Sequence, residues 1–551
     1  MRLPGVLTVT MFWAIDQSSA SDATFTHPLN GWYPCDEYTF SGLGSYSGEG
    51  KGAECAIYTA PLCYPGICEA AEFADPTIDV FVKQLPATFG DAKTAHNVWL
   101  IQGGPIYSSI ALESDMVDLH ERLKEAVNMY TMDHRGTGRS TLFDCVAAQT
   151  TTTGSLWGRE IKSSEVPACA KDFRMKYGDL ASFSTTSAAT DILTFITEFS
   201  NGVSTIVFGV SYGTVVVERF MLLNPPSVNG YVLDSVATAS GPGNKFPYYS
   251  RWDIDVDDVG DQFMKLCAED TTCNSHFPSN NLSVTLENLL TKMDSDPNST
   301  CATLLRNSTH ASPSIALRQT LSTLLMDTTT RTLIPPMVYR LARCNTNDLD
   351  VLAHFFREAG TTFTTSQDSV YASDLLFYLI IYSDMWETPA PSISEMKTRF
   401  TNSSIANGLY TYVYTYCAFS KEKSPTSHSA SVLLLSGKLD PQTHPKYAEY
   451  LFDALVSTKK ELITFDYTPH AVVGTTPFVD SNGTRLDCGR ELLASYVRSD
   501  GDLERLDRSC TGKMAEFNLT VPIKYLRDNF ATDKPYDGAY NAGFIPGKES
   551  A

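Results

Sequence analysis

Strands and helices alternate along the first 236 residues, which is the pattern of a mostly parallel, doubly wound sheet. Short runs rich in apolar and β-branched residues predict buried parallel strands, and runs with helical spacing lie between them. The expected strands are 97–101, 128–132, 205–208 and 231–234, and the expected helices cover roughly 110–125, 188–199 and 214–223. Two earlier runs, 55–61 and 77–85, precede this core, and the polar alternation in the second favours antiparallel edge strands.

The pattern changes after Val236, where strand signals become scarce. Helices are expected near 315–326, 335–343 and 374–381, and sheet character resumes at 432–435 and 462–465. We therefore predict an α/β protein of one core and one insertion. Residues 21–236 and 429–551 form the two parts of the core, and 237–428 form a helical cap that covers the site and selects substrates.

The strand expected at 205–208 runs into a pentapeptide of the form Gly-x-Ser-x-Gly, Gly209-Val210-Ser211-Tyr212-Gly213. So short a motif also arises by chance, and its surroundings must decide the interpretation. Here a buried strand precedes it and a helix follows, as a nucleophile elbow requires. The turn is sharp and crowded, so that it needs glycine on both sides of the serine. The sequence therefore predicts Ser211 as a catalytic nucleophile.

An acid and a base each follow one of the last two expected strands, Asp440 the first and His470 the second. A serine hydroxyl becomes a good nucleophile when a histidine accepts its proton, and a carboxylate on the far ring nitrogen orients that histidine. Of the ten histidines only His444 and His470 follow Asp440, and His444 is too near in sequence to come from the next strand. The order Ser211, Asp440, His470 is the one that α/β-hydrolases use.

A glycine pair, Gly103-Gly104, follows the strand expected at 97–101. Such a pair lets backbone N–H groups turn toward a ligand, so the backbones of Gly104 and Tyr212 are the expected oxyanion hole; an ordinary turn is the alternative. A second glycine-rich loop, 133–140, lacks the ending of a phosphate-binding loop and is interpreted as scaffold. No Cys/His cluster has zinc spacing and no His-Glu-x-x-His motif occurs, so neither a metal nor another cofactor is expected.

Composition and the first residues indicate a secreted, extracellular protein. The net charge of −21 argues against nucleic-acid or anionic-membrane partners. Residues 1–20 have the form of a signal peptide, since Arg2 precedes an apolar run too short to span a bilayer and small residues suited to cleavage follow. Thirteen cysteines suit an oxidising compartment. N-glycans are possible at Asn281, Asn298, Asn307, Asn402, Asn482 and Asn518.

Together these residues resemble the secreted tripeptidyl-aminopeptidase-like serine peptidases, relatives of prolyl iminopeptidases within the α/β-hydrolases. The resemblance covers most of the mature chain. Its parts are Gly103-Gly104-Pro105, the Asp-x-Arg-Gly-x-Gly-x-Ser loop at Asp133, the run 185–191, Gly-x-Ser-Tyr-Gly-Thr at Gly209, Gly-x-x-Asp-Pro-x-Thr at Gly437, and the terminal Cys488 and Cys510. It implies an α/β-hydrolase fold and an exopeptidase that releases short N-terminal peptides or single residues, with Ser211, Asp440 and His470 as its triad.

An aminopeptidase must hold the free ammonium of its peptide, and a buried cation needs a carboxylate. Acidic residues are many in the expected cap, and the sequence does not choose among them. The resemblance implies Asp384, which aligns with the acidic residue of an Ala-Ile-x-Cys-x-Asp stretch in relatives. The chain departs from that stretch at Tyr382, where relatives have cysteine. It also departs at Ile106, His444 and Pro469, where relatives usually have glycine, proline and glycine.

Proximity along the chain and the family-like pair at its end predict four disulfides, Cys145–Cys169, Cys267–Cys273, Cys301–Cys344 and Cys488–Cys510. Two more are expected among Cys35, Cys55, Cys63 and Cys68, whose spacing leaves the pairing open. Cys417 is then the free thiol, because Tyr382 replaces the partner that relatives supply. A buried apolar setting is expected to keep it inert.

Two other functions would use the same fold. A carboxylesterase or lipase needs the same triad and differs from an aminopeptidase in its cap. A non-catalytic binding protein on a hydrolase fold would usually lack the nucleophile or the base, whereas Ser211, Asp440 and His470 are all present. An aminopeptidase acting on peptides with a free N-terminus is the leading hypothesis.

Overall fold

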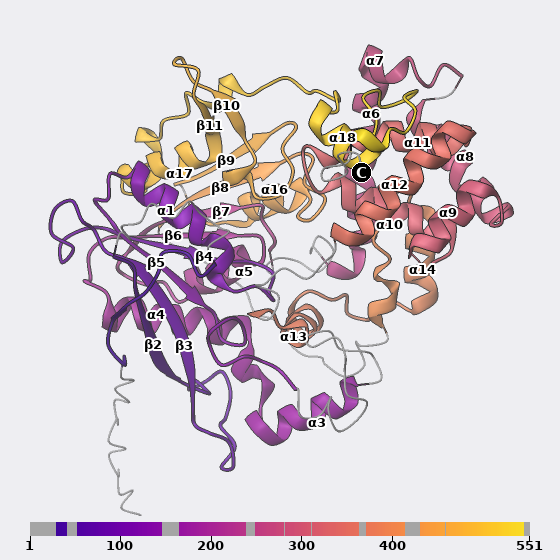
Figure 1. Cartoon of the computed structure of the whole chain (residues 1–551). Coiled ribbons are helices and arrows are strands. Elements are labelled where there is room, and N and C mark those ends of the chain that lie inside the picture. The colour runs from indigo at the N-terminus through magenta and orange to yellow at the C-terminus, as the bar shows by residue number, and fades with distance from the viewer. Residues whose placement is uncertain are drawn as a thin grey trace, which may run out of the picture.

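The computed structural model describes residues 29–40, 52–145, 165–238, 248–279, 281–309, 311–362, 371–413, 430–457 and 459–544. In this part of the chain one sheet has nine strands in the order β1-β2-β3-β5-β4-β6-β7-β8-β9 (Figure 1). They are β1 (Tyr33–Pro34), β2 (Glu54–Pro61), β3 (Thr77–Leu85), β4 (Asn97–Ile101), β5 (Asn128–Asp133), β6 (Thr205–Val210), β7 (Val228–Asp234), β8 (Ser431–Gly437) and β9 (Lys460–Phe465). A small hairpin joins β10 (Pro477–Val479) to β11 (Arg485–Asp487). The expected signal peptide, 1–20, and Cys417 lie outside the described residues.

Strand direction divides the large sheet into two parts. The pairs β1–β2, β2–β3 and β3–β5 are antiparallel, and every pair from β5 to β9 is parallel. The position of β5 between β3 and β4, followed by parallel strands, is the strand arrangement of the α/β-hydrolase fold. The predicted fold class is therefore confirmed, including antiparallel strands ahead of the parallel core.

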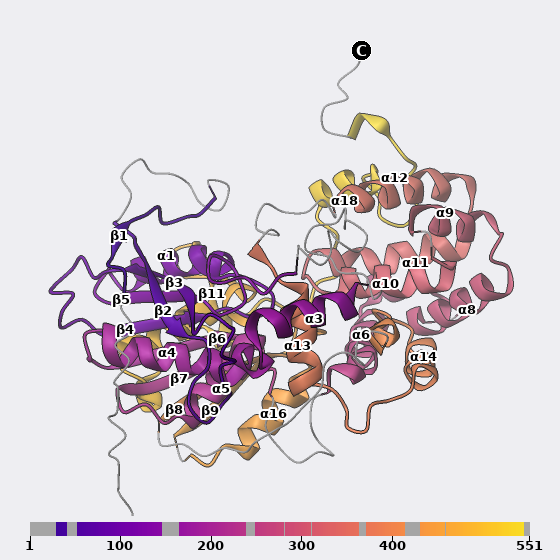
Figure 2. The same ribbon diagram turned by 90° about the horizontal axis from the view of Figure 1, so that it is seen from below.

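Alternate side chains of the central strands enter two different hydrophobic clusters, because successive residues of a strand point to opposite faces. On β4, Trp99 and Ile101 join a cluster with α4 (Thr185–Phe199), α5 (Tyr212–Leu222) and α16 (Pro445–Ala454). Val98 and Leu100 join a cluster with α1 (Glu113–Arg122) and α17 (Cys488–Arg498). Helices thus cover both faces of the sheet (Figure 2).

A second, helical body lies beside the sheet and has a hydrophobic core of its own (Figure 1). Its helices are α6 (Trp252–Glu269), α7 (Thr271–Asn274), α8 (Leu282–Ser295), α9 (Thr300–Thr309), α10 (Pro313–Leu325), α11 (Ile334–Arg343), α12 (Thr346–Thr362) and α14 (Ile393–Asn402). Between the two bodies lies α13 (Asp374–Asp384), whose apolar side chains belong to the cluster of the sheet. The helical character expected for 237–428 is present, and α13 brings part of that segment to the core.

The end of the chain differs from the expected domain boundary. Residues 429–551 are expected in the core, yet Leu526 and Phe530 of α18 (Ile523–Phe530) lie in the hydrophobic cluster of the cap. Arg340 of α11 fastens this segment, donating hydrogen bonds of 2.7, 3.1 and 2.9 Å to the carbonyls of Pro535, Lys534 and Gly538. Both views show α18 beside α12. The core therefore ends before this segment, because the apolar face of α18 is buried by cap helices.

Six disulfides join twelve cysteines of the described chain. The four predicted pairs, Cys145–Cys169, Cys267–Cys273, Cys301–Cys344 and Cys488–Cys510, are confirmed. The four N-terminal cysteines, whose pairing the sequence left open, form Cys35–Cys55 and Cys63–Cys68.

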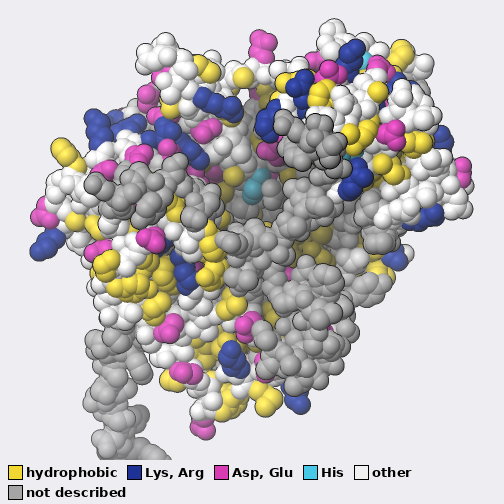
Figure 3. Space-filling view, viewed as in Figure 1, with side chains coloured by type: hydrophobic (Ala, Val, Ile, Leu, Met, Phe, Trp, Pro, Cys, Tyr) yellow, Lys and Arg dark blue, Asp and Glu magenta, His cyan; other side chains and the backbone are white. Residues whose placement is uncertain are grey.

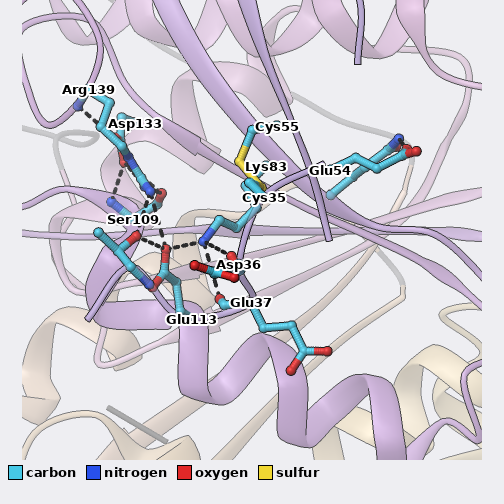
Figure 4. The surroundings of a disulfide bond; sticks show 12 residues. Cys35, Asp36, Glu37, Glu54, Cys55, Lys83, Ser109, Glu113, Asp133 and Arg139 are labelled. Atoms are coloured by element: carbon cyan, nitrogen blue, oxygen red, sulfur yellow. Dashed lines mark hydrogen bonds and ion pairs between the residues drawn. A yellow bond between two sulfur atoms is a disulfide. The ribbon is translucent and has the colours of Figure 1, made fainter. Parts of the chain in front are cut away.

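The loop at 133–140 forms a buried charge network next to the first disulfide (Figure 4). Asp133 is fully buried, accepts hydrogen bonds from the backbone (2.7 Å) and hydroxyl (2.6 Å) of Ser109, and pairs with Arg139 at 2.7 Å. Burial would raise the pKa of Asp133, but Arg139 and the hydrogen bonds hold it below its usual value. Through Ser109 the network fixes the segment that follows Gly103-Gly104. This agrees with the scaffold role expected for the loop at 133–140.

The surface of the described chain carries the asparagines of all six sequons in exposed positions, at 281, 298, 307, 402, 482 and 518. Acidic and basic side chains are interspersed on the face drawn in Figure 3. Among the described residues, no helix combines the length and apolar character needed to cross a membrane.

Candidate active site

Ser211 lies at the junction of β6 and α5 in a strained backbone conformation, with φ of 56° and ψ of −125°. Its N–H donates to the carbonyl of Asp234, 3.0 Å away. A Cβ on Gly209 would lie 2.6 Å from the carbonyl oxygen of Gly213, and one on Gly213 would lie 2.4 Å from that of Ile101. Both contacts are too short for any side chain, so the two glycines permit the sharp turn that presents the Ser211 hydroxyl.

The loop after β4 packs directly on this turn. A Cβ on Gly103 would lie 2.9 Å from Cβ of Ser211 and 3.1 Å from the backbone nitrogen of Tyr212. Gly104 follows with a φ of 125°, which side chains rarely adopt. The structure thus places the glycine pair against the serine and the residue after it, where the backbones of Gly104 and Tyr212 are the expected oxyanion donors.

His470 and Asp440 lie on neighbouring loops, after β9 and β8. Nδ1 of His470 is 3.1 and 3.0 Å from the two carboxylate oxygens of Asp440, which leaves Nε2 on the other side of the ring. Asp440 also accepts hydrogen bonds from the backbone N–H groups of Gln442 and Thr443, both at 2.9 Å, and from the Thr443 hydroxyl at 2.6 Å. These donors leave the carboxylate little freedom to move.

Burial and charge oppose each other in this pair. The side chain of His470 is 13% exposed and that of Asp440 is 1% exposed. Burial would lower the pKa of His470, but the charge and hydrogen bond of Asp440 outweigh it and raise that pKa. Burial would raise the pKa of Asp440, but His470 and Thr443 hold it below its usual value. The arrangement favours an ionised carboxylate and stabilises a protonated imidazole.

Asp234, the last residue of β7, joins the serine and histidine segments and was not singled out by the sequence. Its carbonyl binds the N–H of Ser211, and its fully buried carboxylate accepts N–H bonds from Val472 (2.8 Å) and Val473 (2.9 Å), just after His470. The signal available was an acid directly after the apolar run Tyr231-Val232-Leu233 at the end of a buried strand. Such a position at the carboxyl end of a parallel strand belongs to the edge where sites are built.

Asp384, the last residue of α13, approaches the same turn from the cap side. The Thr185 hydroxyl donates to the Asp384 carboxylate at 2.8 Å. The Thr185 hydroxyl oxygen also lies 2.8 Å from the phenol oxygen of Tyr212. Because the Thr185 proton is used on Asp384, the Tyr212 hydroxyl is the donor in the second bond. Burial raises the pKa of Tyr212, and the Asp384 charge raises it further. The predicted amine-binding residue is thus two hydrogen bonds from the residue next to Ser211.

Other acidic residues of the cap are occupied by donors within the protein. Asp253 accepts the N–H groups of Asn407, Gly408 and Leu409 at 2.8, 3.0 and 3.0 Å. Asp257 accepts those of Ser404 and Ile405, Asp255 binds Lys446 and Tyr447, and Glu387 binds Arg399 and Ser250. The contacts of Asp253, Asp257 and Glu387 fix loops and helices of the cap, whereas those of Asp255 reach α16 of the core. Within the described residues, no group of three or more His, Cys, Asp or Glu side chains could hold a metal ion.

The candidate residues lie where the two bodies meet. Figure 3 shows a hollow on this face between the core on the left and the cap on the right, with a histidine side chain at its floor. Ser211 and His470, the predicted nucleophile and base, are half-buried, so part of each residue is open to solvent.

No family model matches the sequence, and no curated protein matches it significantly. Solved structures do match. A proline iminopeptidase from Mycobacterium smegmatis is 11% identical, with 79% of this chain and 98% of that chain covered and a TM-score of 0.33. Acetyl xylan esterase 1 from Thermoanaerobacterium sp. JW/SL YS485 is 11% identical, with 80% of this chain and 82% of that chain covered and a TM-score of 0.30. An esterase from Exiguobacterium antarcticum is 10% identical, with 73% of this chain and 91% of that chain covered and a TM-score of 0.28. The strand order of the chain, and not these low TM-scores, assigns it to the α/β-hydrolase fold.

Proposed function

We propose that this protein is a serine hydrolase that acts as a secreted aminopeptidase on peptides with a free N-terminus. One observation carries the proposal: the His470–Asp440 hydrogen bond, on a loop that Asp234 ties to the strained turn at Ser211. A nucleophile on an elbow and a histidine oriented by a buried carboxylate are the parts that acyl transfer needs.

In the proposed reaction, the Ser211 hydroxyl attacks the substrate carbonyl while Nε2 of His470 takes its proton. Asp440 stabilises the imidazolium, and the N–H groups of Gly104 and Tyr212 bind the oxyanion. His470 then gives the proton to the leaving amine, which departs and leaves an acyl-enzyme on Ser211. Water attacks this ester by the same route, with His470 as its base, and restores the serine.

Asp384 is the proposed partner of the substrate ammonium. It is half-buried, and its link through Thr185 to Tyr212 sets it at a fixed position relative to the nucleophile. Burial would make an unpaired substrate cation costly, so a carboxylate at this position favours peptides with a free N-terminus. Asp384 is the candidate because this link through Thr185 joins the end of α13 to the residue next to Ser211.

Secretion is supported by the six disulfides and by the exposed sequon asparagines. N-glycosylation and removal of residues 1–20 are parts of the same proposal. Intact-mass measurement of the secreted protein before and after enzymatic deglycosylation tests both.

A substrate panel tests the class of reaction. Fluorogenic di- and tripeptide amides with a free amine, the same amides with an acetylated amine, and short-chain esters are compared by kcat/KM. We expect free-amine amides to exceed their acetylated partners by at least about tenfold, since the blocked amine loses a charge-assisted contact. Hydrolysis of esters without hydrolysis of either amide would make the protein a carboxylesterase instead.

A further inference from the structure

Two consecutive residues, Asp234 and Ser235, hold the three residues that follow His470. The Ser235 hydroxyl oxygen accepts the N–H of Ala471 at 2.8 Å, and the Asp234 carboxylate accepts those of Val472 and Val473. The hydroxyl of Ser235 also donates to Asp234 at 3.1 Å, so the two acceptors support each other. Three successive backbone N–H groups are thereby satisfied by two side chains at the end of β7.

The same dipeptide is fixed to the strands on both of its sides. The carbonyl of Asp234 accepts the N–H of Ser211, and the N–H of Ser235 donates to Leu435 of β8 at 3.0 Å. Ser235 has a φ of 53°, an uncommon conformation for a residue other than glycine. The dipeptide is therefore held in one geometry, and it sits between the segment of the proposed nucleophile and the segment of the proposed base.

Asp234 also acts on His470 through its charge. In the described part of the chain, the charged groups that shift the pKa of His470 are Asp440, with the larger effect, and Asp234. Burial raises the pKa of Asp234 to about 6, against the N–H groups of Val473 and Val472 and the charge of His470. Above that pH the carboxylate is ionised, and its negative charge favours the protonated form of His470.

We propose that Asp234 is a positioning residue that holds the His470 loop against the nucleophile turn. This inference rests on the proposed roles of Ser211 and His470 and extends them to a carboxylate that binds the backbone just after His470. Asp440 orients the ring, while Asp234 and Ser235 fix the backbone that carries it. Catalysis depends on such placement, because an error of about 1 Å can cost on the order of a hundredfold in rate.

The test compares Asp234→Asn with wild type on the best substrate of the panel. An asparagine has nearly the same size but offers one acceptor oxygen in place of two, so either Val472 or Val473 would face an NH₂ group. We expect kcat to fall about 10- to 100-fold with KM within about threefold of wild type. The acid limb of the kcat/KM profile should also move to lower pH, because a negative charge near His470 is removed.

A matched control is Asp257→Asn in the cap. Asp257 likewise accepts two consecutive N–H groups, from Ser404 and Ile405 at 2.7 and 3.1 Å, and burial likewise raises its pKa to about 6. This variant should lose thermal stability while its kcat and acid limb stay as in wild type. An equal fall in kcat and an equal shift of the limb in both variants would reduce the effect of Asp234 to general destabilisation and overturn the inference.

Ser235→Ala separates placement from charge and decides the matter if Asp234→Asn does not fold. It removes the bond to Ala471 and leaves the Asp234 carboxylate in place, so kcat should fall about 2- to 10-fold with the acid limb unmoved. Unchanged kcat in Ser235→Ala, or in a folded Asp234→Asn, would refute the positioning role. Labelling by a fluorophosphonate keeps the two proposals apart: if wild type is neither labelled at Ser211 nor active, the proposed function itself fails and this inference falls with it.

Discussion

Buried carboxylates have different tasks in the core and in the cap, although their chemistry is the same. In the core, Asp440 and Asp234 stand at the carboxyl ends of β8 and β7 and hold the segment that carries His470. In the cap, Asp253 and Asp257 stand on α6 and hold the backbone at 404–409. All four carboxylates accept N–H groups of a loop. Of the four, Asp440 and Asp234 are the two that hold a titratable side chain, His470, in place.

The difference follows from where the acceptors are anchored. Parallel strands end at one edge of the sheet, so residues there converge from distant parts of the sequence. A helix in a layered cap presents its acids to whichever loop packs beside it. The abundance of acidic residues in the cap therefore reflects its construction. Asp384 differs from Asp253 and Asp257 because its Thr185 contact leads to the core, next to Tyr212.

The largest effect should come from breaking the core site. Ser211→Ala should leave the protein folded and secreted but lower turnover by about a million-fold and abolish fluorophosphonate labelling, because nucleophile and base act as a unit. His470→Ala should match it within about an order of magnitude. Single-turnover assays and labelling of purified variants measure both. Undiminished labelling of Ser211→Ala would place the nucleophile at another residue.

A stability effect should come from breaking the cap at Arg340. Its side chain is fully buried, pairs with the buried Asp348 at 3.1 Å and holds three carbonyls of the C-terminal segment. Arg340→Met should lower the free energy of unfolding by about 3–5 kcal/mol, since Asp348 loses a buried partner and the carbonyls lose their donors. Denaturation in urea measures the loss, and limited proteolysis near α18 should become faster.

The matched control for that variant is Arg343→Met, in the same helix. Arg343 also pairs with Asp348, at 2.7 Å, but 30% of its side chain is exposed. It should cost at most about 1 kcal/mol, because water screens and replaces much of its interaction. Arg343 also pairs with Asp537 and donates to the Tyr536 carbonyl, both in the C-terminal segment. Similar losses in the two variants would therefore show that the exposed Arg343 contributes as much stability as the buried Arg340, and would contradict the prediction.

The fold was predictable where the information is local. Continuous apolar runs predict β6 and β7, and the glycines on both sides of Ser211 predict the sharp turn. These strands and this turn could therefore be predicted from short stretches of the sequence. Chain order predicted Asp440 and His470 after successive strands, and in the structure Nδ1 of His470 lies 3.0 Å from the Asp440 carboxylate. Their catalytic roles stay predictions until the variants are measured.

Long-range packing could not be predicted in the same way. Nothing in the sequence near α18 says that its apolar face belongs to the cap, because a helix with one apolar stripe fits either core. The role of Asp234 depends on N–H groups about 240 residues later in the chain, which no local pattern reveals. The pairing of Cys35 with Cys55 likewise depends on the β1–β2 contact.

The link between cap and core is tested by Asp384→Asn. The change removes one charge but keeps an oxygen that can accept the Thr185 hydroxyl. We expect KM for free-amine peptides to rise about 10- to 100-fold, the range of a charge-assisted hydrogen bond, with little change for an ester. Parallel kinetics on both substrates measure the effect, and Asp257→Asn serves as the control. Equal losses on peptide and ester would assign Asp384 a structural role only.

The smallest effect on activity is expected for Cys417, which lies between the described residues 371–413 and 430–457. Twelve cysteines form six disulfides, and the chain has thirteen, so parity predicts that Cys417 is the single thiol. Thiol titration in denaturant should give about one group per chain for wild type and none for Cys417→Ser, whose activity should stay within about twofold. Non-reducing peptide mapping after iodoacetamide treatment in denaturant then locates the label. A label on another cysteine, or a disulfide-linked dimer that dissociates on reduction, would show that Cys417 has a partner and would contradict the alignment that places Tyr382 where relatives have cysteine.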